Sequence, residues 1–221
     1  MGLDVSARFE TALQAALRHA PDAVVLTGDF CAHDPVAEVY ARLEERLRRT
    51  GLPYLPLPGN HDARGLLRAA CGLPGVGEEP VYGVWRVGER PLLYLDTSRG
   101  RVDSEQLDWL AGAVREYPQA PLFMHHPPLE MGVAFMDQKY PLEDPDLLRE
   151  VLRAGGPRRI FCGHYHATCT VGWEGLQVYL CPPTSFFIRA DAPDFELVDR
   201  PPGYLLLEWL DDGRFRCAAG H

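Results

Sequence analysis

The chain has 221 residues, 46% of them hydrophobic, and carries a formal net charge of −9. This size and apolar content predict a single domain over residues 1–221 with a sizeable core. The acidic balance argues against nucleic acid as a partner, because sequence-independent binding of nucleic acid needs a basic face. No apolar run reaches the roughly 18 residues that cross a bilayer, and the first residues lack a signal-peptide pattern. We therefore expect a cytoplasmic protein without a membrane partner.

Helices and strands are predicted to alternate along most of the chain. Apolar residues at helical spacing, with capping residues, indicate helices, and short apolar runs that end in glycine or proline indicate strands. In chain order we expect a helix over 6–19, a strand over 23–26, a helix over 36–49, a strand over 54–57, a hairpin of strands over 81–87 and 92–95, a helix over 104–116, a strand over 122–124, a long loop to about residue 144, a helix over 146–154 and a strand over 160–162. The remainder is predicted to form antiparallel strands.

Short polar motifs follow several of these strands directly. Alternating helices and strands are typical of a layered α/β domain. Open α/β sheets place their ligand sites at the carboxyl ends of the strands. We therefore expect motifs that are far apart in the sequence to meet in one crevice.

Five side chains in these motifs form a candidate metal site. They are Asp29, Asn60, His125, His164 and His166. One carboxylate, one amide oxygen and three imidazoles suit borderline divalent ions such as Mn, Fe, Co or Zn, whereas calcium prefers oxygen ligands alone. Each motif taken singly is commonly an ordinary turn or a hydrogen-bonded histidine. The prediction rests on their joint occurrence, in this order and each at a strand end.

Four of the loops resemble four of the five sequence blocks of the calcineurin-like metallophosphoesterase family. The blocks are Gly28-Asp29, Gly59-Asn60-His61-Asp62, His125-His126-Pro127-Pro128 and Gly163-His164-Tyr165-His166. The resemblance runs along nearly the whole chain and is marked for the bacterial branch of glycerophosphodiesterases and class III cyclic nucleotide phosphodiesterases. It implies an α/β/β/α sandwich of the metallo-dependent phosphatase type. It also implies hydrolysis of small anionic phosphodiesters by a metal-activated hydroxide.

The resemblance assigns a role to each candidate ligand. Asp29 would bridge two metal ions. Asn60, His125 and His164 would complete the site of the second ion, and His166 would ligate the first ion.

Neighbouring residues receive roles from the same resemblance. His61 would lie beside the scissile phosphate as the catalytic residue, either stabilising the transition state or donating a proton. His126 and Asp62 are expected to support the ligands, because metal-bound imidazoles usually need hydrogen-bonding partners. Asp96, after the strand over 92–95, is expected to give structural support and not to bind the ion.

One family block has no counterpart in this sequence. The family begins with a strand that carries Asp-x-His, whereas Asp4 is followed two places later by Ser6. The first site then keeps at most Asp29 and His166, so we expect one strong metal site and a weakened one. The missing strand is expected to expose a sheet edge or a cleft. Either the gene starts upstream, or the protein is a one-metal or inactive relative.

Three readings of the function remain at this stage. The first is a phosphodiesterase, the second is a non-catalytic binding domain on the same fold, and the third is a phosphomonoesterase of the same superfamily. The segment 130–143 is a candidate lid because Met131, Phe135, Met136 and Tyr140 suit an apolar cover, although an ordinary packed loop fits the same residues. Family relatives are often dimers or larger, so a homodimer or higher oligomer is also considered.

Overall fold

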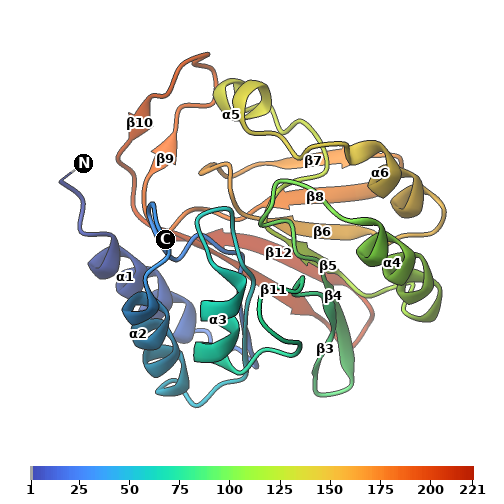
Figure 1. The fold of residues 1–221 in the computed structure, drawn as a ribbon, viewed down its shortest axis with the longest axis horizontal. Coiled ribbons are helices and arrows are strands. Elements are labelled where there is room, and N and C mark those ends of the chain that lie inside the picture. Colours follow the sequence, from blue (N-terminus) through green and yellow to red (C-terminus); the bar gives the residue numbers. More distant parts are fainter. Residues whose placement is uncertain (1) are drawn as a thin grey trace.

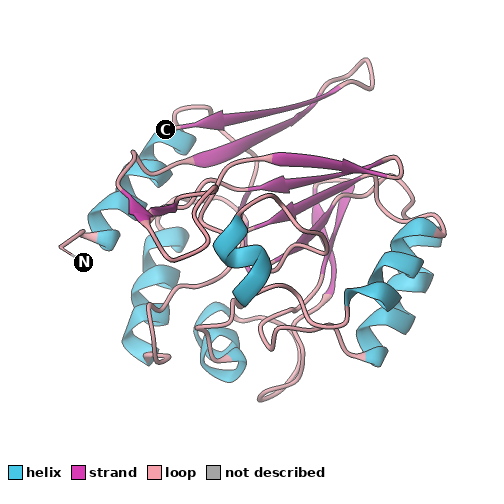
Figure 2. Ribbon diagram, turned by 90° about the horizontal axis from the view of Figure 1, so that it is seen from above, coloured by secondary structure: helices cyan, strands magenta, loops and turns pink. Residues whose placement is uncertain are grey.

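Two groups of helices enclose the strands in the computed structural model, which describes residues 2–221 (Figure 1). Seen from above, Figure 2 shows the strands between the helices that begin the chain and a second group on the opposite side. The helices are α1 (Val5–Leu17), α2 (Ala37–Arg48), α3 (Arg64–Cys71), α4 (Ser104–Glu116), α5 (Ala134–Lys139) and α6 (Pro145–Arg153).

The largest sheet is six-stranded, with the order β3-β4-β5-β6-β8-β7. Strands β4, β5, β6 and β8 are parallel neighbours, and the two edge strands β3 and β7 run antiparallel to them. The strands are β3 (Gly83–Val87), β4 (Arg90–Tyr94), β5 (Leu122–Met124), β6 (Arg159–Cys162), β7 (Thr170–Trp173) and β8 (Leu176–Leu180).

Shorter sheets lie beside this one. A parallel pair is formed by β1 (Val24–Leu26) and β2 (Tyr54–Pro56), and antiparallel pairs are formed by β9 (Phe187–Ile188) with β10 (Leu197–Val198) and by β11 (Tyr204–Trp209) with β12 (Phe215–Gly220). Within residues 2–221, β1 has β2 as its only strand partner. One edge of β1 is therefore without a strand partner among these residues.

Alternation along the strands separates two cores. Successive side chains of a strand point to opposite faces, so Phe123 and Phe161 pack with Leu55 between the sheets, while Leu122 and Ile160 pack toward the helices. The inner cluster also contains side chains of β11 and β12, and the outer one contains side chains of α4 and α6. Together with a third cluster under α2 and α3, this gives the predicted α/β/β/α layering.

Most predicted elements are confirmed within one to three residues of their bounds. Two helices were not predicted, α3 at 64–71 and α5 at 134–139. Because α5 lies between β5 and α6, the prediction of one long loop up to residue 144 was wrong. The tail is not uniformly antiparallel either, because β8 pairs with β6 in parallel. In the part of the chain that the structure describes, no helix is both long and apolar enough to cross a membrane.

Candidate metal centre

The four predicted ligand loops follow β1, β2, β5 and β6 and meet at the carboxyl ends of these strands. The loop after β5 is tied to the loop after β6, because the backbone N–H of Gly163 donates to the carbonyl of His125 over 3.0 Å. The loop after β1 joins them, because the ring of His125 donates through Nδ1 to the carbonyl of Thr27 over 2.5 Å. The topology therefore converges as the sequence predicted.

Three potential ligand atoms lie close to a fourth, the Nε2 atom of His125. The Nε2 atom of His125 lies 3.2 Å from Asp29 Oδ2, 3.2 Å from Asn60 Oδ1 and 3.2 Å from His164 Nδ1. The His125 side chain is only 1% exposed and that of Asp29 16%, whereas Asn60 is exposed. The cluster is thus buried on one side and open to solvent on the other.

The hydrogen bonds of the rings leave the converging nitrogens without protons. His125 uses Nδ1 to donate to a backbone carbonyl, and His164 uses Nε2 to donate to the carbonyl of Tyr140 over 3.0 Å. The Nε2 atom of His125, an acceptor in the neutral ring, faces oxygens of Asp29 and Asn60 and the Nδ1 atom of His164. With neutral rings these atoms are all acceptors, so a positive charge among them, either a cation or a proton on His125, relieves their repulsion.

The three spacings around His125 are compatible with a shared borderline ion. Ligands about 2.0–2.1 Å from a tetrahedral ion are about 3.3 Å apart from each other, close to the 3.2 Å between His125 Nε2 and each of its three neighbours. Two nitrogens and two oxygens suit Mn, Fe, Co or Zn. The residues present therefore fit the ion that the sequence predicted, without distinguishing among these metals.

Without a cation, a proton takes its place between His125 and Asp29. Burial by itself raises the pKa of Asp29, but the charge and hydrogen bond of His125 outweigh burial and hold this pKa below its usual range. Burial lowers the pKa of His125, yet the Asp29 carboxylate overrides it and raises the pKa. Burial and the neighbouring His125 lower the pKa of His164 to about 3, which keeps its ring neutral and able to bind an ion.

His166 lies next to this cluster and outside it. Its Nδ1 donates to the carbonyl of Phe186 over 2.9 Å, which leaves Nε2 as the acceptor. Burial lowers its pKa, and Asp29 acts in the opposite direction, so the imidazole lies within electrostatic range of the carboxylate. Asp29 and His166 are the two predicted ligands of the first ion, and no further ligand from an Asp-x-His strand joins them in residues 2–221.

His61, the predicted catalytic residue, is held at the same place through its backbone. Its backbone N–H donates to Asp29 Oδ1 over 3.0 Å. The other carboxylate oxygen, Oδ2, contacts His125 Nε2. The half-buried ring of His61 is close enough to His166 to lower the pKa of that residue. The ring therefore lies within electrostatic range of His166.

Three of the predicted ligands have left-handed backbone conformations. The φ angles are 62° at Asp29, 65° at His164 and 48° at His166. Residues with a side chain adopt such angles at a cost of about 1–3 kcal/mol each, and such strain is concentrated at functional sites. The glycine at 59 allows the close approach, because a Cβ atom there would overlap the Asp29 side chain.

A second set of residues supports the ligands. The Asp62 carboxylate accepts the backbone N–H groups of Asp29 and Gly59, each over 2.8 Å. His126 forms a tight group with His125 and His164. Its Nδ1 lies 3.0 Å from the Thr97 hydroxyl. Burial lowers the pKa of His126 well below its usual value. Asp62 therefore supports the backbone of the Asp29 loop, whereas His126 is hydrogen-bonded to Thr97 and lies against the ligand rings.

Asp96 is likewise structural and does not reach the cluster. Its carboxylate pairs with Arg64 over 2.8 Å, in a contact in which the side chains are 0% and 4% exposed. It also accepts the backbone N–H of Val81 and that of Ser98. The pair ties α3 to the end of β4.

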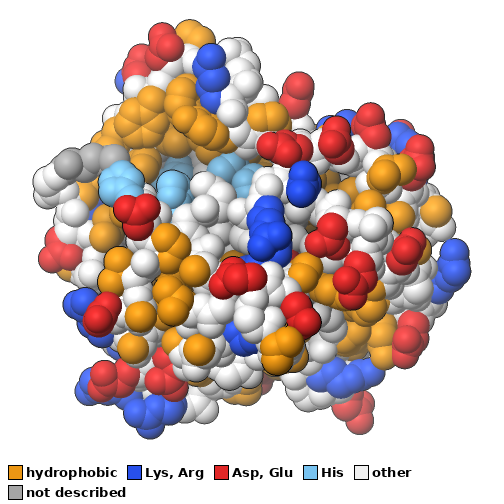
Figure 3. All heavy atoms as spheres, in the orientation of Figure 1, with side chains coloured by type: hydrophobic (Ala, Val, Ile, Leu, Met, Phe, Trp, Pro, Cys, Tyr) orange, Lys and Arg blue, Asp and Glu red, His pale blue; other side chains and the backbone are white. Residues whose placement is uncertain are grey.

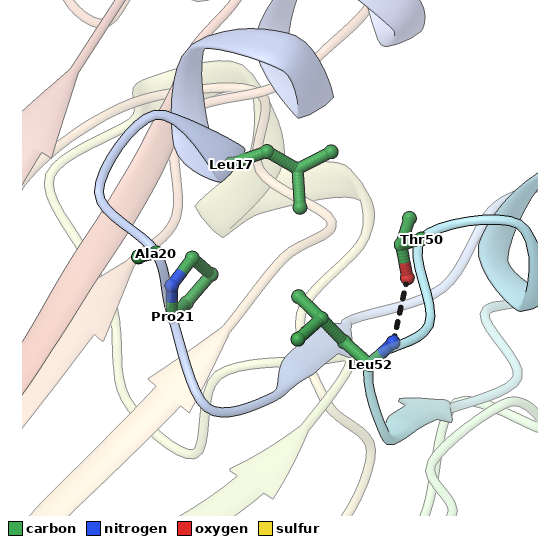
Figure 4. A pocket seen from close by; sticks show the side chains of 5 residues that line it. All are labelled: Leu17, Ala20, Pro21, Thr50 and Leu52. Carbon is green, nitrogen blue, oxygen red and sulfur yellow. Dashed lines mark hydrogen bonds between the residues drawn. The ribbon is translucent and has the colours of Figure 1, made fainter.

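The surface around the site is hollowed. In Figure 3, histidine side chains line a depression beneath a ridge of hydrophobic side chains. A separate hollow, drawn in Figure 4, lies at the ends of α1 and α2 and is lined by Leu17, Ala20, Pro21, Thr50 and Leu52. This second hollow has no titratable side chain in its lining, so the chemistry belongs to the histidine depression.

Sequence reasoning did not find the backbone carbonyls that orient the imidazoles. They belong to Thr27, Tyr140 and Phe186. A carbonyl is present at every position, so no residue type indicates these three. The sequence predicted an apolar cover that includes the side chain of Tyr140, but it did not predict that the carbonyl of this residue contacts His164.

Comparisons with known proteins agree with this geometry. The family model of calcineurin-like phosphoesterases matches residues 4–168. A probable cyclic nucleotide phosphodiesterase of Fibrobacter succinogenes is 30% identical over 210 residues, which cover 94% of this chain and 82% of that protein. A glycerophosphodiester phosphodiesterase of Enterobacter lignolyticus is 33% identical over 184 residues, which cover 76% of this chain and 64% of that protein.

A solved structure shares the fold at low identity. It is GAP50, the anchor in the inner membrane complex of Plasmodium, with a TM-score of 0.64 and 10% identity. The match covers 99% of this chain and 80% of that one. This likeness concerns the arrangement of helices and strands alone.

Proposed function

Because the chain belongs to the calcineurin-like phosphoesterase family, we propose that it hydrolyses small phosphodiesters with the help of a divalent ion. The ion is held by Asp29, Asn60, His125 and His164. The observation that carries the proposal is the convergence of the other three ligand atoms on His125 Nε2, each 3.2 Å from it. The names of the relatives, which refer to cyclic nucleotides and glycerophosphodiesters, support small diesters as the substrate class.

The chain's own residues prepare the reaction. When bound, a divalent ion supplies charge neutralisation at the phosphoryl oxygens and lowers the pKa of a water molecule. The carbonyl acceptors fix the imidazole tautomers, so His125 and His164 turn unprotonated nitrogens toward the centre. His61 is proposed to lie beside the scissile phosphate, where its imidazole stabilises the transition state or donates a proton to the leaving oxygen.

The first ion site is proposed as the weaker one. It has Asp29 and His166 as its ligands in this chain, whereas the second site has four. Fewer ligands give a lower affinity, so we propose that one ion binds strongly and another weakly. Whether one ion in the strong site is sufficient for turnover then distinguishes an enzyme from a binding domain.

A direct test uses purified protein with added Mn²⁺ and the diester bis(p-nitrophenyl) phosphate. We expect turnover in the wild type and loss of at least about 100-fold in kcat/KM for His125→Ala and Asn60→Ala, because each removes a ligand of the strong site. His19→Ala is the matched control, since this imidazole contacts Tyr204 and not the cluster. Unchanged turnover in the ligand variants would refute the proposal.

The same assay separates the remaining readings. Turnover of p-nitrophenyl phosphate without turnover of the diester would indicate a phosphomonoesterase. Metal binding without turnover of either compound would indicate a binding domain.

Several finer assignments are proposed on the same basis. Residues 1–221 form one metallophosphoesterase domain, and the segment 130–143 covers the crevice. In this segment Met131 and Met136 are buried and α5 is hydrogen-bonded to the β9–β10 hairpin through Ala134 and Ala190, so the cover is a fixed wall. The metal is Mn, Fe, Zn or Co, the location is the cytoplasm, and a homodimer or higher oligomer remains a proposal that sedimentation can test.

A further inference from the structure

The orientation of the His166 ring depends on one short segment of the chain. Nδ1 of His166 donates to the carbonyl of Phe186 over 2.9 Å, and the ring of Phe186 stacks on the imidazole at 4.4 Å between centroids and 26° between planes. The backbone carbonyl of His166 accepts the N–H of Ile188 over 2.9 Å. The direction in which Nε2 of His166 points is therefore set by residues 186–188.

The first part of this segment lies outside the strands. Ser185 and Phe186 come after the end of β8 at Leu180 and before the start of β9 at Phe187. The carbonyl of Ser185 accepts a hydrogen bond from Nε of Arg8, which is 177 residues away and belongs to α1. In Figure 1, α1 and β9 lie on the same side of the molecule. An arginine of the first helix thus takes the place of a strand neighbour for this segment.

The guanidinium of Arg8 joins two separate stretches of the chain. Besides its contact with Ser185, it donates through Nη2 to the carbonyl of Arg200 and through Nη1 to Oδ1 of Asp199, the latter over 2.9 Å. The Arg8 side chain is 17% exposed. A guanidinium presents its N–H groups in a rigid planar fork. Three acceptors around this fork therefore hold it in place, and it holds them in turn.

The carbonyl that Arg8 holds is one residue away from the carbonyl that orients His166. The carbonyl of Ser185 and the amide nitrogen of Phe186 belong to one planar peptide unit. Only φ and ψ of Phe186 therefore separate the acceptor of Arg8 from the acceptor of His166. The hydroxyl of Ser185 also lies 3.4 Å from Nδ1 of His166. A shift of the Ser185 carbonyl is thus passed on to the imidazole.

We infer that Arg8 is a positioning residue for His166 and thereby controls the affinity of the first ion site. This inference rests on the proposed function, which places the weaker ion at Asp29 and His166. A guanidinium has no acceptor and cannot ligate a cation, so Arg8 acts through the segment that it holds. His166 has a left-handed backbone with φ of 48°, a conformation that persists only where surrounding contacts impose it.

Charge and position predict opposite effects of removing Arg8. A guanidinium repels a nearby cation, so an effect of charge alone would make Arg8→Gln bind the first ion more tightly and leave Arg8→Lys like the wild type. Loss of positioning weakens the first ion in both variants, because neither side chain offers the planar fork. The direction of the change therefore distinguishes the two causes.

The first measurement needs neither a metal nor a substrate. In ¹⁵N-labelled metal-free protein at neutral pH, two-bond ¹H–¹⁵N correlation spectra report which imidazole nitrogen carries the proton, and His166→Gln assigns the signals. We expect His166 to be protonated at Nδ1 in the wild type, because this nitrogen donates to a carbonyl. In Arg8→Lys and Arg8→Gln we expect a mixture of both tautomers.

The second measurement is a calorimetric titration with Mn²⁺. Partners that orient a metal-bound imidazole typically change metal affinity about 10- to 100-fold. Arg8 acts one contact further away, so we expect the weaker ion to bind about 10-fold less tightly in both variants, with the affinity for the stronger ion unchanged. Arg46→Gln is the matched control, because Arg46 also pairs with α1, through Glu10 over 2.6 Å, and not with residues 185–186.

Four results would overturn the inference. They are a wild-type His166 protonated at Nε2, the absence of a second, weaker equivalent of Mn²⁺ in the wild type, tighter or unchanged binding of that ion in Arg8→Gln, and an equal loss in Arg46→Gln. If Arg8→Gln does not fold, Arg8→Lys, which keeps the charge and a donor group, gives the same comparison.

The outcomes also separate this inference from the proposed function. A mixed tautomer and a weaker first ion in the Arg8 variants, without hydrolysis of any diester by the wild type, leave the positioning role and remove the enzyme. Hydrolysis of bis(p-nitrophenyl) phosphate, with wild-type tautomer and ion affinities in the Arg8 variants, leaves the phosphodiesterase and removes the positioning role.

Discussion

The carboxylate of Asp62 holds two predicted ligand loops together, and its replacement by asparagine is the sharpest test of how the site is built. Oδ2 accepts the backbone N–H groups of Asp29 and Gly59, each over 2.8 Å. Oδ1 accepts the N–H of Phe30 and the hydroxyl of Tyr40, each over 3.1 Å. The loops after β1 and β2 thus share one anion.

The magnitude follows from counting donors. An asparagine offers one oxygen and one NH₂ group, so either orientation leaves two of these four donors facing another donor. Hydrogen bonds to a charged group contribute about 1.5–3 kcal/mol each. Burial raises the pKa of Asp62, so the charged carboxylate also carries a desolvation cost that asparagine avoids. We expect Asp62→Asn to lower the free energy of unfolding by about 2–4 kcal/mol.

The same change should weaken the metal site, because Asp29 loses its backbone anchor. Loss of a residue that supports a ligand typically lowers metal affinity about 10- to 100-fold. Urea unfolding of the metal-free protein measures the first effect, and calorimetric titration with Mn²⁺ the second. Asp103→Asn is the control: Asp103 caps α4 by accepting one N–H from Gln106, and asparagine caps equally well. An Asp62→Asn protein with metal affinity within 2-fold of wild type would refute this account.

Further predictions address the same scaffold. Gly59→Ala places a Cβ atom against the Asp29 side chain, so we expect Mn²⁺ affinity to fall by at least about 10-fold in calorimetry. Mn²⁺ at 100 times its dissociation constant should raise the unfolding free energy by about 2.7 kcal/mol, an effect that a chelator reverses. Arg46 lowers the pKa of Glu10 from 4.5 to about 2 by hydrogen bonding. Because the Glu10 side chain is 43% exposed, Glu10→Gln should cost only about 0.5–1 kcal/mol at neutral pH in urea unfolding. A lowered pKa stabilises the fold above pH 4.5, so this cost should vanish as the pH falls through about 2.

The order of elements and the convergence of the ligands were predictable because both depend on local patterns. The helix over 104–116 has apolar residues at helical spacing and a capping Asp103, and its bounds agree with α4. The strand over 122–124 agrees with β5. Parallel strands end at one edge of a sheet, which brings the loops of each sheet near one another. The loops after β1 and β2 belong to a different sheet from those after β5 and β6, so their meeting also depends on how the two sheets pack.

Two helices were missed for reasons that differ. For α3 the sequence contained a stop signal, Gly72, which ends the helix in a left-handed conformation with φ of 66°. The segment of α5 has only six residues, too few for periodicity to be decisive. Three backbone N–H groups just before the helix donate to Asp137, and the backbone N–H of Ala134 donates to the distant carbonyl of Ala190.

The left-handed backbone conformations of three predicted ligands explain why the sequence did not predict the detailed geometry of the site. Asp29, His164 and His166 each carry a conformational cost, which local preference would avoid. The cost is offset by contacts that do not involve an ion: Asp62 holds the backbone at Asp29, and carbonyls hold the rings of the two histidines. The fold itself therefore maintains the ligand positions, and an incoming cation replaces a proton between side chains that are already in place. Sequence motifs identify which side chains take part, whereas the energy that fixes them comes from distant residues with no motif of their own.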